Sequence, residues 1–149
     1  MVARRYRSTA VRRIFNRLVV WLIERGWFDR RTHLLTAPGR RTGQLHTTPV
    51  TLVGDESVRY VVAPYGPVQW VRNVRAASQV TLRRGAKLET VSLHELGPHD
   101  AAPVLREYLA TVAIVRPYFD VRPNSPLEDF EAEAGRHPVF EIRAVTDPG

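Results

Sequence analysis

Six short segments with the composition and alternation of β-strands constrain the fold of this chain most. Most of them are joined by short turns, such as Arg84-Gly85-Ala86, rather than by long linkers. Strands joined mainly as hairpins favour a mainly β protein with inserted helices, and specifically a small split antiparallel β-barrel. We expect the strands at residues 33–37, 45–53, 58–63, 79–84, 87–96 and 139–145.

Helices are expected in the gaps between the later strands. The segment 68–76 has helical spacing, and Asp100 is suited to cap a second helix that reaches residue 115. Ser125, Pro126 and Glu128 form a capping-box pattern, which predicts a third, acidic helix that ends at residue 135. In that helix we expect Glu131 and Glu133 to form a solvated face.

The composition narrows the possible classes of function. A chain of 149 residues with 44% hydrophobic and 25% charged residues is typical of one soluble globular domain. The absence of cysteine excludes disulfides, thiolate metal sites and a cysteine nucleophile. The five histidines include no close pair at helical spacing, so we expect no metal site.

The basic residues are concentrated at the N-terminus. Residues 1–31 hold nine arginines against Glu24 and Asp29 and so carry the whole net charge of +7. We therefore divide the chain into a basic N-terminal arm, residues 1–31, and a barrel domain, residues 32–149.

The arm has the pattern of an amphipathic helix from residue 9 to residue 25, with Gly26 suited to end it. Its apolar run, residues 18–23, is far shorter than the roughly 20 residues that span a bilayer. Two interpretations stay open: the helix packs on the barrel, or it holds a cytoplasmic protein at the anionic inner face of the cell membrane. Nucleic acid is disfavoured as a partner, because aromatic residues are not interleaved with the arginines.

The turn between the first two expected strands has the features of an anion site. Gly39 and Gly43 permit backbone conformations in which amide groups face one point, and Arg40 and Arg41 add guanidinium groups that match phosphate or carboxylate oxygens. Pro49 cannot donate to a sheet, which indicates an edge, a bulge or a gap that holds a ligand. The simpler alternative is a hairpin with a solvated basic turn.

Three separated motifs occur in an order that is similar to the deazaflavin-dependent nitroreductase family. They are residues 39–44 with Thr47-Thr48-Pro49, the strand end 61–63 followed by Gly66, and Gln69-Trp70 with Asn73. The resemblance is clearest over residues 32–96. It implies a split barrel of the flavin-reductase and pyridoxamine-oxidase type. It also implies binding of coenzyme F420, with hydride transfer from F420H2 to a quinone, a nitro compound or another unsaturated acceptor.

The resemblance also implies which residues form the site. Arg40, Arg41 and Thr42 would hold the phosphate and oligoglutamate tail of F420. The deazaflavin ring and ribityl chain would be lined by His46, Thr47, Thr48, Pro49, Val50 and Thr51 and by Ala63, Pro64, Tyr65 and Gly66. Gln69, Trp70, Val71, Arg72 and Asn73 would close the other side.

Two tyrosines are candidates for contact with the acceptor. Tyr65 lies beside Gly66 at a strand end, and our hypothesis is that it donates a hydrogen bond or a proton to the reduced oxygen. Tyr118 is the candidate that the resemblance implies from the C-terminal third.

Two other functions stay open at this stage. The same barrel could bind FMN, because both cofactors are flat rings with phosphate tails. The chain could also be a non-enzymatic module that binds a cofactor or a membrane. Relatives of this barrel type are often paired through their sheets, so a homodimer is also open.

Overall fold

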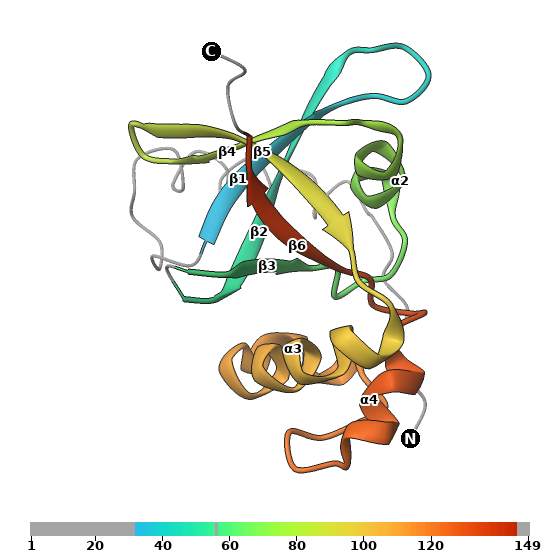
Figure 1. Cartoon of the computed structure of the whole chain (residues 1–149). Coiled ribbons are helices and arrows are strands. Elements are labelled where there is room, and N and C mark those ends of the chain that lie inside the picture. The colour runs from blue at the N-terminus through green and yellow to red at the C-terminus, as the bar shows by residue number, and fades with distance from the viewer. Residues whose placement is uncertain (1–31, 56, 146–149) are drawn as a thin grey trace.

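A closed six-stranded antiparallel barrel forms the centre of the computed structural model, which describes residues 32–55 and 57–145 (Figure 1). The strand order is β1-β2-β3-β6-β5-β4, and β4 pairs back onto β1. The expected β-barrel is therefore confirmed, with each strand within one residue of its predicted ends. The strands are β1 (Thr32–Pro38), β2 (Leu45–Gly54), β3 (Arg59–Val62), β4 (Val80–Arg84), β5 (Lys87–Glu95) and β6 (Val139–Ala144). The expected amphipathic arm, residues 1–31, lies outside the described residues.

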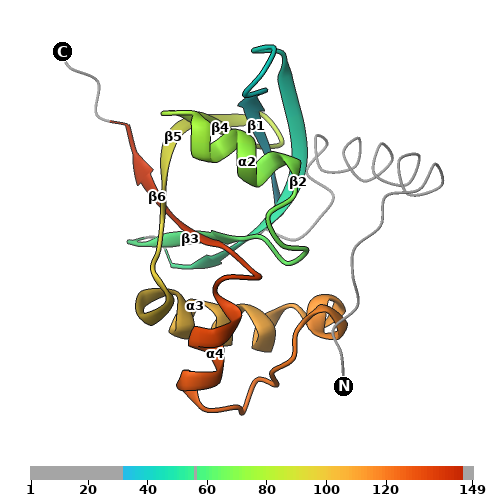
Figure 2. The ribbon, with the colours of Figure 1, turned by 90° about the vertical axis from the view of Figure 1, so that its right-hand side faces the viewer.

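Alternation along the strands creates two hydrophobic cores. In β2, Val50 and Leu52 point into the barrel, whereas Val53 points to the helices outside it. Helix α2 (Gln69–Ala76) adds Val71 and Val74 to the inner core, and Figure 2 shows it packed against the barrel near β1 and β2. Each such buried side chain contributes about 1.5–3 kcal/mol.

The pairing of β2 opens the barrel on one side. β2 pairs with β1 from Leu45 to Thr51, but it pairs with β3 only from Leu52 to Gly54. Over the first part of β2, the edge that faces away from β1 therefore has no partner strand. Pro49 lies in this part, and its missing N–H suits a position beside an open edge.

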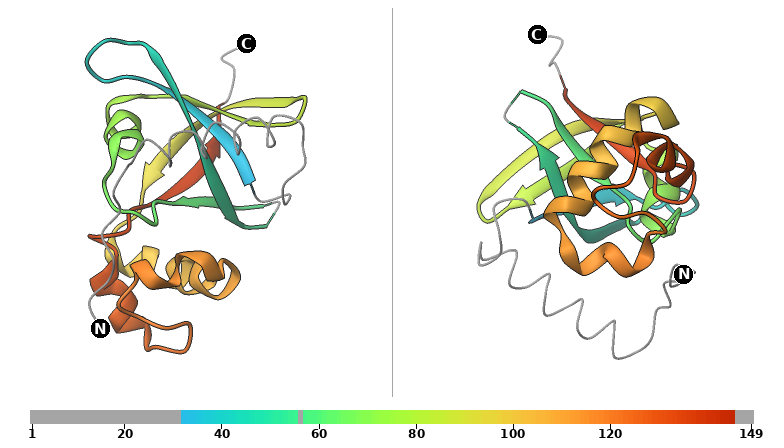
Figure 3. Two further views of the ribbon diagram at one scale, coloured as in Figure 1. Left: turned by 180° about the vertical axis from the view of Figure 1, so that it is seen from behind. Right: turned by 90° about the horizontal axis from the view of Figure 1, so that it is seen from below.

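A helical layer covers the lower end of the barrel in Figure 1, and the view from below in Figure 3 shows α3 and α4 lying across it. The layer consists of α3 (Pro98–Thr111), the 3₁₀ helix η1 (Ala113–Tyr118) and α4 (Leu127–Glu133). It forms the second core, in which Leu105, Tyr108 and Phe130 pack against Val53 and Val62. No helix in the described part of the chain is long and apolar enough to cross a membrane.

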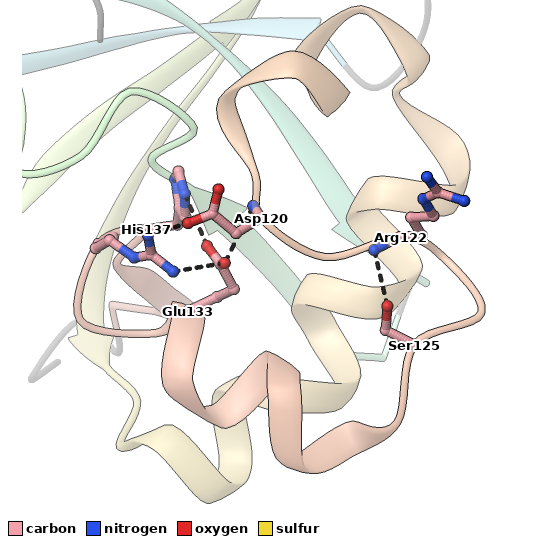
Figure 4. Close-up of polar contacts among 6 residues, drawn as sticks. Asp120, Arg122, Ser125, Glu133 and His137 are labelled. Carbon is pink, nitrogen blue, oxygen red and sulfur yellow. Dashed lines mark hydrogen bonds and ion pairs between the residues drawn. The ribbon is translucent and has the colours of Figure 1, made fainter. Parts of the chain in front are cut away.

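Two expected helix caps were wrong. Gly97 is the N-cap of α3, so Asp100 lies in the first turn instead, where its charge still favours the helix dipole. The α-helix ends at Thr111, short of the expected residue 115, and the 3₁₀ helix that follows it contains Pro117, which lacks an N–H for a helical hydrogen bond. In α4 the N-cap is Pro126, and Ser125 Oγ accepts a hydrogen bond from the Arg122 amide, 2.9 Å away, instead of capping the helix (Figure 4).

Glu133, expected on a solvated face, is 1% exposed and joins α4 to the segment after η1 (Figure 4). Its Oε1 accepts hydrogen bonds from the Asp120 amide (3.1 Å) and Arg136 Nη2 (2.7 Å). Its Oε2 lies 3.1 Å from His137 Nε2, and the His137 ring stacks on Phe119 at 3.8 Å. Arg136 also bonds to the Asp120 carboxylate, which raises the pKa of the guanidinium. Glu133 therefore fixes the chain directly after Tyr118.

Replacing Glu133 by alanine should lower the free energy of unfolding by about 2–4 kcal/mol, because the Asp120 amide and the Arg136 guanidinium lose a buried carboxylate acceptor and the close contact with His137 is lost. Urea denaturation measures this loss. The control is Glu128→Ala, an exposed carboxylate in the first turn of the same helix, for which a change within about 0.5 kcal/mol is expected. Equal effects of the two substitutions would show that the Glu133 contacts do not stabilise the fold.

Candidate functional site

A cavity of about 750 Å³ lies along the open edge of β2. This volume is within the usual range for sites that hold small organic ligands or cofactors. The cavity is bounded by the β1–β2 turn, β2, the segment 62–68, α2 and α3. In Figure 1 the β1–β2 turn, drawn in cyan, and α3 lie at opposite ends of the molecule. The cavity lining therefore extends from the turn at one end of the barrel to the helical layer at the other.

The structure brings most of the sequence-predicted site residues to this cavity. Those that line it are Arg40, Arg41, Thr42, His46, Thr47, Thr48, Pro49, Val50, Thr51, Pro64, Tyr65, Gln69, Trp70 and Asn73. Five others are absent from the lining: Ala63, Gly66, Val71, Arg72 and Tyr118. Ala63 and Val71 are buried in the barrel core, and Arg72 is exposed.

Tyr118 and Gly66 lie next to the lining and support it. The Tyr118 ring meets the Tyr65 ring edge-on, with centroids 4.8 Å apart. Gly66 has φ = +87°, and a Cβ there would lie 3.2 Å from the Arg136 carbonyl oxygen. The turn that carries Tyr65 thus depends on a glycine and abuts the corner after α4.

The β1–β2 turn uses its glycine amides internally. The Gly39 amide donates to the Gln44 carbonyl at 2.7 Å, and the Gly43 amide donates to the Gly39 carbonyl at 2.8 Å. Gly43 has positive φ, at 73°, whereas Gly39 is tightly packed, because a Cβ there would lie 3.1 Å from His46 Nε2. The amides of Gly39 and Gly43 are therefore used within the turn, and the side chains of the turn are its clearest donors toward the cavity.

Arg40 is held by helix α2. Its Nη1 donates to Gln69 Oε1 at 2.7 Å and to Asn73 Oδ1 at 2.9 Å, and its amide donates to the same Asn73 oxygen at 3.2 Å. Asn73 is 5% exposed, so these bonds to a charged group are sheltered from water. Arg40 thereby ties the turn to α2, and most of its hydrogen-bonding capacity at Nη1 is already used.

Arg41 has no hydrogen bond or ion pair with any other residue that the structure describes. It is exposed, lines the cavity, and is adjacent to Thr42, whose Oγ1 accepts from the Gln44 amide at 3.3 Å. A free guanidinium beside a hydroxyl is suited to bind phosphate or carboxylate oxygens. We call this part of the cavity, Arg41 with Thr42, the anion end.

The opposite end of the cavity is apolar and was missed by the sequence analysis. Val62, Val112 and Val115 line it, together with Tyr65 and Tyr108. Tyr108, Val112 and Val115 follow each other at helical spacing, but this pattern also describes an ordinary packed helix. Among residues 32–55 and 57–145 no group of His, Asp or Glu side chains could hold a metal ion.

Fold and cavity together define a split-barrel protein with a cavity that is lined by arginine and hydroxyl side chains as well as apolar ones. The F420H2-dependent quinone reductase family matches residues 6–123, and this chain belongs to that family. The match ends before α4 and β6, so Glu133 lies beyond it. A search among curated proteins gives no match.

Solved structures support the fold. An F420H2-dependent reductase, FDR-A, is 21% identical, with a TM-score of 0.53, over 78% of this chain and 96% of that one. A structure described as a domain-swapped dimer is 18% identical, with a TM-score of 0.55, over 90% and 100%. A protein of the pyridoxinephosphate oxidase family from Clostridium acetobutylicum is 8% identical, with a TM-score of 0.51, over 88% and 84%. The split-barrel fold class is thus confirmed.

Asn73→Ala should lower the free energy of unfolding by about 1–3 kcal/mol, because Arg40 loses two hydrogen bonds to one buried oxygen. Arg72→Ala removes an exposed side chain from the same helix and should change it by less than about 0.5 kcal/mol. Chemical denaturation of both variants checks the difference. If Asn73→Ala is as stable as Arg72→Ala, the hydrogen bonds between Arg40 and Asn73 do not stabilise the fold.

Proposed function

We propose that this protein is an F420H2-dependent oxidoreductase that transfers a hydride to a quinone, a nitro compound or another unsaturated acceptor. The observation that carries the proposal is the cavity itself, in a member of the F420H2-dependent quinone reductase family. It has at one end an arginine with no partner among the described residues, and at the other an apolar wall. The structural neighbour FDR-A is described as a reductase that depends on the same cofactor.

The residues present fit this cofactor. A phosphorylated, polyanionic tail requires cationic and hydroxyl donors, which Arg41 and Thr42 provide at the mouth of the cavity. A flat ring requires apolar contact and a few fixed polar groups, and β2 from His46 to Thr51 faces the cavity with both kinds. Trp70 is half-buried, and the centroid of its ring lies 6.1 Å from that of Phe140. It adds a rigid aromatic wall to the cavity.

When bound, the reduced deazaflavin supplies the hydride, and the protein supplies orientation and a dry environment. The open edge of β2 and the segment that carries Pro64 and Tyr65 would hold ring and acceptor face to face. Tyr65 is 36% exposed and borders the cavity. We assign it the role of donating a hydrogen bond or a proton to the oxygen of the reduced acceptor.

FMN is the alternative cofactor, and nothing in the family match favours it. A titration of the protein with oxidised F420 and, separately, with FMN tests the assignment. We expect saturable F420 binding that weakens as salt is added, with much poorer binding of FMN. Arg41→Ala should weaken F420 binding by roughly tenfold or more, because a charged hydrogen bond is worth about 1.5–3 kcal/mol.

The matched control for that titration is Arg83→Ala, an exposed arginine on β4 away from the cavity, for which the F420 affinity should not change. Tight binding of FMN would replace the F420 assignment. Binding of neither cofactor would contradict the proposed function.

The proposal includes a location at the membrane, because residues 1–31 carry the whole net charge and have apolar residues at three- and four-residue spacing in their sequence. Quinones of membranes would then be within reach of the site. The proposal also includes a homodimer, since one solved neighbour is described as a domain-swapped dimer.

Charge reversal in the arm tests the membrane part. We expect that replacing Arg12, Arg13 and Arg17 by glutamate in the full chain weakens its co-sedimentation with phosphatidylglycerol vesicles by roughly tenfold or more. In the control variant, three arginines of the barrel domain are replaced by glutamate instead: Arg83, Arg122 and Arg143. This variant should bind the vesicles like the unmodified chain. Vesicle binding that is unaffected by the arm substitutions and by salt would exclude electrostatic anchoring.

A further inference from the structure

Tyr108 places a polar group in the apolar end of the cavity. It lies in α3, its side chain is 2% exposed, and yet it lines the cavity beside Val112 and Val115. Its ring packs in the second core, with its centroid 6.4 Å from that of Phe119. The ring is therefore held in place by its neighbours in the core.

The Tyr108 hydroxyl has no partner within the described part of the chain. None of the hydrogen bonds between described residues involves it, and it is not among the fully buried polar atoms that lack a partner. The hydroxyl thus opens into the cavity, the space that its side chain lines. Since a buried tyrosine hydroxyl is usually hydrogen-bonded, its partner is expected to be a ligand.

The environment keeps this hydroxyl protonated. Burial is the main cause that raises the pKa of Tyr108, and the nearby Tyr65 adds to it. A neutral hydroxyl in a dry pocket donates a strong hydrogen bond but gives up its proton poorly. Tyr108 is thereby suited to stabilise negative charge on a ligand oxygen rather than to act as an acid.

We propose that the Tyr108 hydroxyl donates a hydrogen bond to the acceptor oxygen on which negative charge develops during reduction. This inference rests on the proposed function. A quinone that takes up a hydride gains two electrons and one proton and becomes a hydroquinone monoanion, while the deazaflavin is oxidised. A second proton, from water or through Tyr65 at the exposed rim, then completes the hydroquinone.

The two tyrosines therefore have different roles. Tyr65 is 36% exposed and meets solvent, so it can exchange protons with water. Tyr108 is enclosed, so its dipole acts at low dielectric, where it needs no reorganisation when charge appears. This arrangement fits an apolar acceptor whose carbonyl or nitro oxygen lies at the end of the molecule that enters the cavity first.

Tyr108→Phe removes only the hydroxyl and should lower kcat/KM for menadione, with F420H2 as reductant, by about 100-fold. The affinity for oxidised F420 should not change. Tyr60→Phe is the matched control, because Tyr60 lies on β3 outside the cavity lining, and it should behave like the unmodified protein. Tyr65→Phe, measured in the same series, should lower kcat as well, and unchanged kcat and KM for every acceptor would exclude its role.

Ligand binding without turnover provides the second readout. Menadione should bind to the F420-loaded protein more tightly than 2-methylnaphthalene, which has a similar shape but no oxygen, and Tyr108→Phe should weaken only menadione, by about 3- to 10-fold. If the unmodified protein oxidises no F420H2, the proposed function is wrong. The comparison of menadione with 2-methylnaphthalene, made without cofactor, would then still test the role of Tyr108. Equal menadione affinity and kinetics in Tyr108→Phe and Tyr60→Phe would overturn the inference about Tyr108.

Discussion

The site depends on the limited pairing between β2 and β3. Because β2 contacts β3 only from Leu52 to Gly54, its first seven residues have one free edge in an otherwise closed barrel. Free strand edges expose unpaired backbone groups and must be covered. Here α2 and the segment 63–68 lie opposite that edge, and the space between them is the cavity. Pro49 stands in this part of the strand, where an N–H is not needed for closure.

Two adjacent arginines show how structure and binding are divided in the turn. Arg40 is bonded to Gln69 and Asn73, so its charge holds the turn against α2. Arg41 lines the cavity without such bonds among the described residues, so its charge stays available to a ligand. The two residues are adjacent in the chain and have the same chemistry. Only the direction in which each side chain leaves the turn gives them different roles.

The sequence was sufficient for the strands, the barrel and most of the cavity lining, because period-two alternation and turn residues are local signals. It failed where the contacts of a side chain depend on how the chain packs in three dimensions. Ser125 was available as a cap but bonds to Arg122, and Glu133 was placed in solvent although Asp120, Arg136 and His137 enclose it. Tyr108 was overlooked for the same reason. Its helical spacing predicts burial, but only the packing of α3 beneath the barrel shows that it also reaches the cavity.

The separation of the anion end from the apolar end has a consequence for catalysis. In the proposed function, a tail held by Arg41 would be bound equally before and during hydride transfer, so that interaction would contribute affinity without changing the barrier. A donor that meets charge only as it develops lowers the barrier itself, and it is most effective where water is excluded. The exposed turn at the anion end suits the first kind of interaction, and the enclosed apolar end beside α3 suits the second. Glu133 holds the Asp120 amide two residues after Tyr118, and the Tyr118 ring packs edge-on against Tyr65 in the lining, so a buried carboxylate outside the cavity is connected to its wall through these contacts.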